Sequence, residues 1–445
     1  MGKKVILWVL ILTYILMLGC GQKSADQAVG TSLPVTDEAV TEETTPIAEN
    51  MPQQAVPDTD AEEIKPPEEE VIPQPVSFWN PICNEYISVF EATDSKEAFA
   101  KIPVGSTIGL LKWEGRFAQV MYNDQIGYVY AHCLKPADEN YFDDKLKVIT
   151  PTNKYSYEQM QADMKKLQAL YPHMVSLSSI GKTGMNRDIP VMVLGQDNAP
   201  YHILVQAAIH GREHFTAWLA MAMADYMLLQ GKVAEDVCYH IIPMSNPDGV
   251  IVSQTGKLEE EQWVVYEMDL EYGYTNLGER AYATLWKANA TGVDVNRNFL
   301  SGWDPSDQRP EVSSENYRGI APFSANESAA LRDYTTARTF HSTLSLHAYG
   351  SVLYYQYGKK EPVNQLSFSL AQTVEGITGY VPTANDNTTG AGYKDWAMEE
   401  LGIPSLTVEI GGNEPPLSQQ EIYNTFDRCR EMLPTVYAWV CRNAA

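Results

Sequence analysis

The chain has 445 residues, of which 44% are hydrophobic, so it is long enough for two or three folded units with a sizeable core. Its formal net charge is −25 at pH 7. Phosphate binding needs clustered Lys and Arg, and this acidity therefore excludes nucleic acid from the expected partners.

Residues 1–20 have the pattern of an export signal. Lys3 and Lys4 precede an almost wholly apolar run, 5–18, which ends just before Cys20. A basic start, a short apolar run and a small-residue cleavage site are typical of a secretory signal, and the run is shorter than the ~20 residues of a spanning helix. The end of the run, Leu-Met-Leu-Gly-Cys, also resembles a bacterial lipobox, which implies a lipid on Cys20 and an anchor in the bacterial cell membrane. An ordinary signal or an uncleaved anchor are the alternatives, and each of the three predicts an extracytoplasmic location.

The next segment, residues 21–76, is predicted to be a disordered linker. It is rich in Pro, Glu, Thr and Gln, and it contains 13 acidic residues and 2 lysines. Low hydrophobicity with one dominant sign of charge does not offset the entropy cost of ordering. An acidic, proline-rich chain is extended, so we expect this segment to hold the folded part away from the membrane.

Residues 77–138 are predicted to form a small all-β barrel. Short apolar stretches with period-2 alternation are separated by turn signals, and they predict strands at 86–90, 108–111, 117–122 and 126–130. The stretch from Lys112 to Val120, with Gly127-Tyr128-Val129 after it, resembles a bacterial SH3-type domain. The resemblance implies either contact with the cell wall or a packing and spacing role.

Residues 150–443 are predicted to form a separate α/β domain. Helical periodicity covers 157–170, with apolar positions at 160, 164, 167 and 170, and a wholly apolar helix is expected at 215–229. Mostly apolar strands are expected at 189–194, 203–208 and 237–243. Alternating helices and continuous apolar strands favour a mixed central sheet flanked by helices.

A candidate metal-binding pair directly follows the strand expected at 203–208. His210 and Glu213 are three residues apart on a turn that enters the apolar helix. Zinc accepts both imidazole nitrogen and carboxylate oxygen, so the two side chains can reach one ion. By itself the pair is a weak signal, because a surface His beside a surface Glu is common.

Further motifs strengthen this interpretation by their order along the chain. They are Asn246-Pro247-Asp248-Gly249, then Asp294-Val295-Asn296-Arg297-Asn298-Phe299, then His347 within Ser-Leu-His-Ala-Tyr-Gly, then Thr407-Val408-Glu409 before two glycines. Together with the His-x-x-Glu pair, this series resembles the zinc carboxypeptidases of the carboxypeptidase A class. The resemblance covers about residues 152–440, and it implies the carboxypeptidase fold.

The resemblance also implies the roles of the catalytic residues. His210, Glu213 and His347 would bind one Zn²⁺ and leave the fourth position to water, as a catalytic zinc site requires. Glu409 would accept the proton of that water and pass it to the leaving amine. Asp294 would accept the remaining N–H of His210 and fix its tautomer.

Substrate recognition is expected to depend on cationic side chains. Asn296 and Arg297 match the clamp that the family uses for a terminal carboxylate, which a planar guanidinium can bind with two parallel hydrogen bonds. Arg212 matches a second substrate-binding arginine of the family. The alternative for both arginines is an ordinary surface ion pair.

The sequence departs from the family pattern at two positions. The region expected to hold an oxyanion-stabilising arginine reads Leu-Trp-Lys-Ala-Asn, and it offers Lys287 instead. A lysine can stabilise an oxyanion, although less rigidly. The position of the mobile tyrosine of animal carboxypeptidases is Asn387, and the nearby Tyr393 does not have the equivalent spacing.

The expected specificity residue is Lys394, within Gly392-Tyr393-Lys394-Asp395-Trp396. The resemblance places it either in the pocket for the C-terminal side chain, where it would favour an acidic group, or facing solvent. The Gly-Tyr-Lys-Asp-Trp and Trp-Lys-Ala-Asn strings resemble the bacterial branch that cleaves γ-D-glutamyl–diaminopimelate bonds in peptidoglycan. We therefore expect trimming of peptidoglycan stem peptides. The alternatives are a general scavenging carboxypeptidase and a non-catalytic wall-binding lipoprotein.

Five cysteines remain besides Cys20, and their pairing is open. Cys83 with Cys133, and Cys429 with Cys441, are candidate disulfides in an oxidising exterior, and free buried thiols are the alternative. The spacing contains no Cys-x-x-Cys, which argues against a cysteine-type zinc site.

Overall fold

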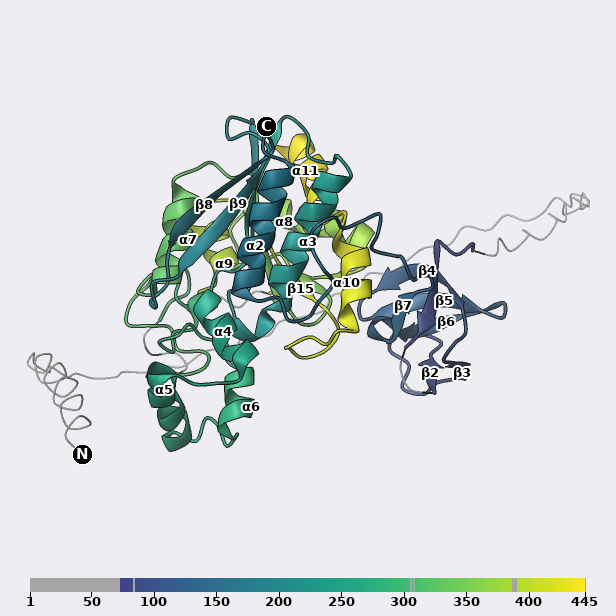
Figure 1. The fold of residues 1–445 in the computed structure, drawn as a ribbon, viewed down its shortest axis with the longest axis horizontal. Coiled ribbons are helices and arrows are strands. Elements are labelled where there is room, and N and C mark those ends of the chain that lie inside the picture. The colour runs from purple at the N-terminus through teal and green to yellow at the C-terminus, as the bar shows by residue number, and fades with distance from the viewer. Residues whose placement is uncertain (1–72, 83–84, 305, 307–308, 386–389, 445) are drawn as a thin grey trace, which may run out of the picture. The chain divides into compact units, whose positions relative to one another are not determined.

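The structure is a computed structural model that describes residues 73–82, 85–304, 306, 309–385 and 390–444 (Figure 1). The predicted signal with Cys20, nearly all of the predicted linker, Cys83 and Asn387 lie outside these residues. The described chain falls within one compact unit. None of its helices combines the length and the hydropathy that crossing a bilayer requires.

The N-terminal part of the described chain is all-β. Its five-stranded antiparallel sheet has the order β6-β5-β4-β1-β7, and β2 and β3 form a separate antiparallel pair. The strands are β1 (Ser77–Pro81), β2 (Tyr86–Val89), β3 (Ala100–Pro103), β4 (Ile108–Glu114), β5 (Phe117–Tyr122), β6 (Gln125–Tyr130) and β7 (Leu134–Pro136). The four strands predicted from period-2 patterns are confirmed, and their ends agree within three residues. The SH3-like assignment stays a prediction.

The larger part contains a mixed sheet, which has eight strands among the described residues. Its order is β14-β13-β15-β12-β10-β11-β9-β8, and the central strands β15, β12, β10 and β11 are parallel. The strands are β8 (Val175–Lys182), β9 (Asp188–Leu194), β10 (Tyr201–Ala207), β11 (Val237–Ile242), β12 (Ser342–Ala348), β13 (Val352–Tyr354), β14 (Val381–Thr383) and β15 (Ser405–Ile410). The sequence-based expectation of a mixed central sheet is confirmed.

Helices cover both faces of this sheet (Figure 1). They are α2 (Tyr157–Leu170), α3 (Phe215–Leu229), α4 (Pro247–Thr255), α5 (Glu260–Glu271), α6 (Glu279–Thr284), α7 (Asn326–Thr336), α8 (Val363–Thr378), α9 (Tyr393–Glu399), α10 (Glu421–Cys429) and α11 (Met432–Asn443). Successive strand residues point to opposite faces, so Ile203 and Val205 of β10 pack with α2, α3, α8, α10 and α11, whereas Leu204 packs with α7 and α9.

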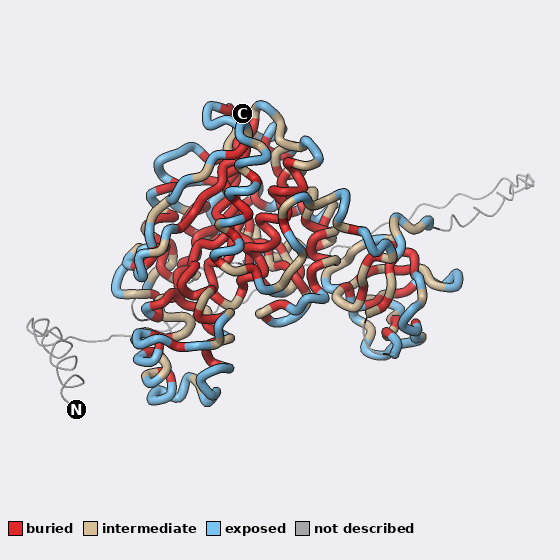
Figure 2. The backbone as a smooth tube through the Cα atoms, viewed as in Figure 1, coloured by how far each residue is buried: buried red, intermediate tan, exposed pale blue. Residues whose placement is uncertain are grey.

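The helix α3 is buried around its whole circumference (Figure 2). A helix that is apolar on all sides is stable only inside a protein, and the sequence predicted both of its ends correctly. The helix α2 also has the predicted bounds, and Met160, Met164 and Leu167 are buried. Leu170, the last residue of this helix and the fourth apolar position of the pattern, is 51% exposed.

The small β region and the larger α/β part are joined by polar contacts at buried positions. The guanidinium of Arg428, on α10, donates from Nη2 to the backbone oxygen of Gly115 at 2.7 Å and from Nε to that of Thr378 at 2.6 Å. The indole of Trp113 donates to Asp427 at 3.0 Å. Arg428 is 1% exposed, so its charge depends on these partners and on the rings that pack around it.

The proposed pairing of Cys429 with Cys441 is wrong, since both cysteines are free. Cys429 ends α10 and is buried, with its Sγ 3.6 Å from the hydroxyl of Tyr380, whereas Cys441 lies on the exposed side of α11. The two thiols therefore lie in different surroundings. The pairing of Cys83 with Cys133 involves a residue outside the described chain and stays a prediction.

Candidate active site

The polar motifs of the sequence meet at the carboxyl ends of the parallel strands β10, β12 and β15. His210 follows β10, and His347 and Glu409 lie near the ends of β12 and β15. Because these strands are neighbours and parallel, their carboxyl ends lie at one edge of the sheet. This edge is where open α/β sheets place their ligand sites.

The turn that carries His210 and Glu213 is a short 3-10 segment, η2 (Gly211–Glu213), between β10 and α3. A Cβ atom on Gly211 would lie 2.4 Å from the backbone oxygen of Gly249 and 2.9 Å from that of Trp286. Only glycine permits such a close approach, so the second residue of the His-Gly-Arg-Glu motif has a steric role.

Asn246 holds this turn in place from the side of α4. Its Nδ2 donates to the backbone oxygens of Ile209, at 3.1 Å, and Ala288, at 3.0 Å. The backbone N–H of Gly211 donates to the oxygen of Lys287 at 3.0 Å. The Asn-Pro-Asp-Gly and Trp-Lys-Ala-Asn strings therefore support the backbone beside His210, a function that their spacing did not reveal.

His210, Glu213 and His347 form a tight buried cluster. The Nδ1 atom of His210 is 2.8 Å from Oε1 of Glu213, and the Nδ1 atom of His347 is 2.9 Å from Oε2 of the same carboxylate. All three side chains are at most 4% exposed by residue, and their donor atoms lie within 4.8 Å of one another. The predicted metal ligands thus converge, from β10, η2 and β12.

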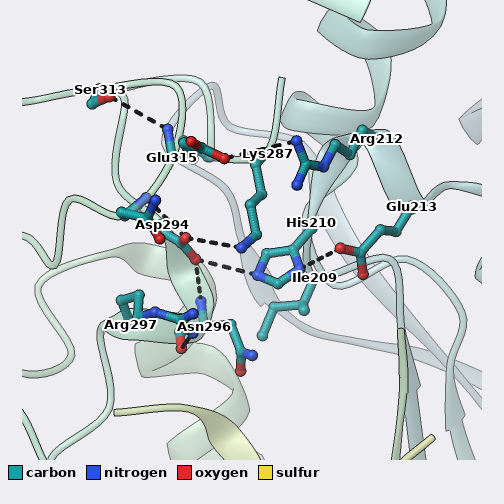
Figure 3. A network of polar contacts seen from close by, with 12 residues as sticks. Ile209, His210, Arg212, Glu213, Lys287, Asp294, Asn296, Arg297, Ser313 and Glu315 are labelled. Carbon is teal, nitrogen blue, oxygen red and sulfur yellow. Dashed lines mark hydrogen bonds and ion pairs between the residues drawn. The ribbon is translucent and has the colours of Figure 1, made fainter. Parts of the chain in front are cut away.

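Asp294 lies beside His210, and dashed lines in Figure 3 join it to His210 and Lys287. Its Oδ1 is 3.3 Å from Nε2 of His210, and its Oδ2 is 3.7 Å from Nζ of Lys287. Burial by itself would raise the pKa of Asp294, but Lys287 and His210 hold that pKa well below its usual range. The ionised carboxylate faces Nε2, which favours the tautomer with a proton there and a lone pair on Nδ1.

The charges of the cluster fit a divalent cation. Burial lowers the pKa of His210, which keeps its ring neutral near pH 7. Burial would raise the pKa of Glu213, but His210 and His347 hold it well below its usual range. Two imidazole nitrogens and an ionised carboxylate are the ligand set of catalytic zinc sites, so the residues present fit zinc.

Glu409 lies beside this cluster. It is the register partner of His347 across β12 and β15, and its Oε2 is buried without a hydrogen-bond partner among the described residues. Burial, reinforced by the charge of Glu213, raises the pKa of Glu409 to about 7, although His347 and Lys287 act in the opposite direction. A carboxyl group with a pKa near 7 is suited to accept and return a proton at neutral pH.

Three of the predicted substrate-binding residues, Asn296, Arg297 and Arg212, lie around the His-Glu-His cluster (Figure 3). Nδ2 of Asn296 is 3.5 Å from Nε2 of His347, and Oδ1 of Asn296 accepts from the backbone N–H of Tyr393 at 3.0 Å. Arg297 and Arg212 are partly buried, and the Nε atom of each has no hydrogen-bond partner in the described chain. Both guanidinium groups thus retain donors for an anionic ligand.

Glu315 was missed by sequence reasoning. Its carboxylate lies 3.7 Å from Nη1 of Arg212 (Figure 3). It is also 3.2 Å from Nη2 of Arg309. It reaches Arg212 from a loop about a hundred residues further along the chain, and no spacing signal predicts such a contact. Arg212 therefore already has a carboxylate partner, at ion-pair distance rather than hydrogen-bond distance.

Lys394 is 6% exposed, so the alternative in which it faces solvent is wrong. Its Nζ is 2.6 Å from Oδ1 of Asp395 and donates to the backbone oxygen of Gln356 at 2.8 Å. The ammonium group therefore already has a counter-ion. Its role in substrate selection stays a prediction, and Asn387 lies outside the described residues.

The mixed sheet and the His-Glu-His cluster with an adjacent buried carboxylate define a metallopeptidase. The family model described as zinc carboxypeptidase matches residues 160–428, and the chain belongs to this family of peptide hydrolases. The predicted enzyme class is therefore confirmed.

Three comparisons give the family context. A γ-D-glutamyl-L-diamino acid endopeptidase of Lysinibacillus sphaericus is 29% identical over 289 residues, which are 62% of this chain and 70% of that protein. Human mast cell carboxypeptidase A is 24% identical over 250 residues, 52% of this chain and 54% of that protein. Among solved structures, a carboxypeptidase A from Helicoverpa armigera has a TM-score of 0.51 at 20% identity, over 74% of this chain and 92% of that chain, and it shows the shared fold.

Proposed function

We propose that the protein is a zinc-dependent peptidase that cleaves stem peptides of peptidoglycan at the γ-D-glutamyl–diaminopimelate bond, outside the cytoplasm. The observation that supports catalysis is the convergence of His210, Glu213, His347 and Glu409 at one edge of the sheet. Two observations support this substrate: the similarity to the Lysinibacillus γ-D-glutamyl-L-diamino acid endopeptidase and the buried lysine Lys394.

His210, Glu213 and His347 would hold one zinc ion, which supplies a water of lowered pKa and polarises the scissile carbonyl. Glu409 accepts the proton of the attacking water and returns it to the leaving amine. The ammonium of Lys287, 12% exposed by side chain, supplies positive charge on the side of Asp294, where it can stabilise the developing oxyanion. Asp294 keeps His210 in the tautomer that leaves Nδ1 free.

Arg297, Asn296 and Arg212 would bind the carboxylates of the substrate. The Nε atoms of both arginines are unused in the described chain, and a guanidinium binds a carboxylate with two parallel hydrogen bonds. Diaminopimelate has more than one carboxylate, so several cations near the zinc ligands suit it. Lys394 would recognise the second carboxylate by exchanging part of its contact with Asp395.

The export signal, the lipid on Cys20 and the SH3-like domain complete the proposal. The lipidated N-terminus would anchor the enzyme in the bacterial cell membrane, the acidic linker would span part of the distance to the wall, and the small β domain would contact wall peptides. These three assignments rest on the sequence patterns. The lipid anchor is tested by labelling cells with a radioactive fatty acid, and the Cys20→Ala variant is the control.

The function is tested by hydrolysis of L-Ala-γ-D-Glu-meso-diaminopimelate beside a hippuryl-type peptide, with and without a chelator, on protein lacking residues 1–20. Cleavage of the γ-D-glutamyl bond that the chelator abolishes is expected. Cleavage of the hippuryl peptide alone would assign the enzyme to general peptide scavenging. Binding to sacculi without any hydrolysis would instead indicate a wall-binding protein.

Lys394→Ala extends this test to specificity. The substitution should lower kcat/KM for the diaminopimelate peptide about tenfold or more, as expected for one lost charge-assisted contact, and leave the hippuryl peptide much less affected. An equal loss on both substrates would contradict a role in selection. The matched control is Lys359→Ala, which removes a lysine from the loop after Gly358.

A further inference from the structure

A second group of metal-ligating side chains lies at the other end of the central strands. His202 is near the start of β10, and Cys238 and His240 are on the neighbouring strand β11. Ala207 lies five positions after His202 on β10, about 16 Å away at the usual rise per residue, and His210 lies beyond Ala207. The two groups are therefore distinct.

Strand register brings the three side chains together. His202 is the direct partner of Cys238 across the parallel pair, and His240 is two residues further along β11. Since side chains alternate between the faces of a sheet, Cys238 and His240 point to the same face as His202. The sequence shows no Cys-x-x-Cys motif, and this cluster arises only when β10 and β11 pair.

The donor atoms lie at distances that one ion can bridge. Nδ1 of His202 is 2.9 Å from Nε2 of His240, and Sγ of Cys238 is 3.3 Å from the same nitrogen. Ligands of one tetrahedral zinc ion, at about 2.0 Å for nitrogen and 2.3 Å for sulfur, are separated by roughly 3.3–3.6 Å. Small side-chain rotations would therefore suffice, without movement of the strands.

Neighbouring groups fix the orientation of the imidazoles. Nδ1 of His240 is 2.7 Å from the hydroxyl of Tyr334 on α7, a contact that leaves Nε2 for the cluster. The ring of Phe340 packs edge-on against His240, with ring centroids 5.0 Å apart. Metal-ligating histidines characteristically use their second nitrogen for such a hydrogen bond.

The cluster also has a route to solvent. Cys238 and His240 are fully buried, but His202 is only partly buried and lines a surface cavity of about 410 Å³ with Asp197 and Arg338. The guanidinium of Arg338 lies over the ring of Tyr334, 3.9 Å from its centroid, and the carboxylate of Asp197 provides an opposite charge at the same cavity. An ion and a water ligand can therefore enter from this side.

We propose that His202, Cys238 and His240 form a second metal site that holds one zinc-type ion and ties β10 to β11, with its fourth position open to water. Two imidazoles and a thiolate are ligands that select zinc over magnesium or calcium. We assign this ion no part in hydrolysis at the first site, because the cluster lies at the opposite end of the strands from His210. Without an ion, the same residues would form a simple hydrogen-bonded chain from His202 through His240 to Tyr334.

Cobalt(II) titration of the full, chelator-stripped chain distinguishes a metal site at His202, Cys238 and His240 from a simple hydrogen-bonded chain. A thiolate bound to cobalt gives a charge-transfer band in the near ultraviolet, whereas the catalytic cluster offers only nitrogen and oxygen ligands. The wild type should bind two equivalents, one for each cluster, and show the band. Glu213→Gln should lower the affinity of the catalytic cluster for cobalt but leave the charge-transfer band unchanged.

Cys238→Ala should bind one equivalent, lose the band and retain hydrolytic activity. His202→Gln, at a partly exposed position, serves as a second variant that disturbs the core less, and it should weaken the band-forming site at least tenfold. Cys429→Ala removes another buried thiol and should leave the band intact. A wild type that binds a single equivalent without the band, or a band that survives Cys238→Ala, would overturn the proposal.

Discussion

Glu409 and His347 are register partners on the neighbouring parallel strands β15 and β12. The pairing places the buried carboxyl group beside a metal ligand, and its position is set by the backbone of the sheet rather than by a flexible loop. Sites built on strands hold catalytic groups more precisely than sites on loops. The carboxyl group that we propose as the proton acceptor and the proposed metal ligands are thereby fixed relative to each other.

Replacement of the proton acceptor should separate catalysis from metal binding. Glu409→Gln keeps the size of the side chain but cannot accept a proton, so kcat/KM should fall about 10²–10⁴-fold while the zinc content is unchanged. Glu375→Gln, on the exposed side of α8, is the control and should behave as wild type. Substantial residual activity in Glu409→Gln would show that another group takes the proton.

The pH dependence should report the ionisation of Glu409. The active form is the carboxylate, so kcat/KM should fall as the pH drops through the pKa of Glu409, which burial raises to about 7. A bound cation would lower that pKa, which places the acid limb at or below pH 7. Lys287 also lowers it, and Lys287→Met should therefore move the acid limb to higher pH. A limb that stays in place or moves downward would contradict this electrostatic coupling.

Asp294 should matter for metal affinity although it is not a ligand. Asp294→Asn removes the ionised acceptor 3.3 Å from His210, and zinc affinity should fall about 10–100-fold, measured by competition with a chelating dye. Asp333→Asn, whose side chain is 66% exposed, is the matched control. Unchanged affinity in Asp294→Asn would mean that His210 is oriented by its other contacts alone.

Arg428 should couple the stability of the small β region to that of the larger part. Arg428→Met leaves the backbone oxygens of Gly115 and Thr378 without their charged donor, and the free energy of unfolding should fall by about 3 kcal/mol. Urea unfolding monitored by tryptophan fluorescence measures this loss. Arg442→Met, at an exposed position on α11, should change stability by less than about 0.5 kcal/mol. Equal stabilities of the two variants would show that these contacts contribute nothing.

Much of the fold and site follows from local sequence patterns. The bounds of α2 and α3 could be predicted, because periodicity depends on neighbouring residues. The converging residues His210, Glu213 and His347 were implied by the resemblance to zinc carboxypeptidases. What could not be predicted depends on pairing between distant segments. The cluster of Cys238 with His202 arises from strand register, and no local pattern encodes it.

The same limitation explains the errors and omissions. Cys429 and Cys441 are near each other in sequence, but one ends α10 in the core and the other lies on the surface of α11. The side chain of Asn246 donates a hydrogen bond to the backbone oxygen of Ile209, and this contact joins two segments that are distant in sequence. Such relationships require the three-dimensional arrangement of backbone segments that sequence spacing does not supply.

The central claim is tested most directly by comparing two tripeptides of identical composition, L-Ala-γ-D-Glu-meso-diaminopimelate and its isomer with an α-linked glutamate. The ratio of kcat/KM values for the zinc-loaded wild type is the quantity to measure. A marked preference for the γ-linked peptide, abolished together with all turnover in Glu409→Gln, is the predicted result. Equal cleavage of both isomers, or a preference for the α-linked one, would contradict the assignment to peptidoglycan stem peptides.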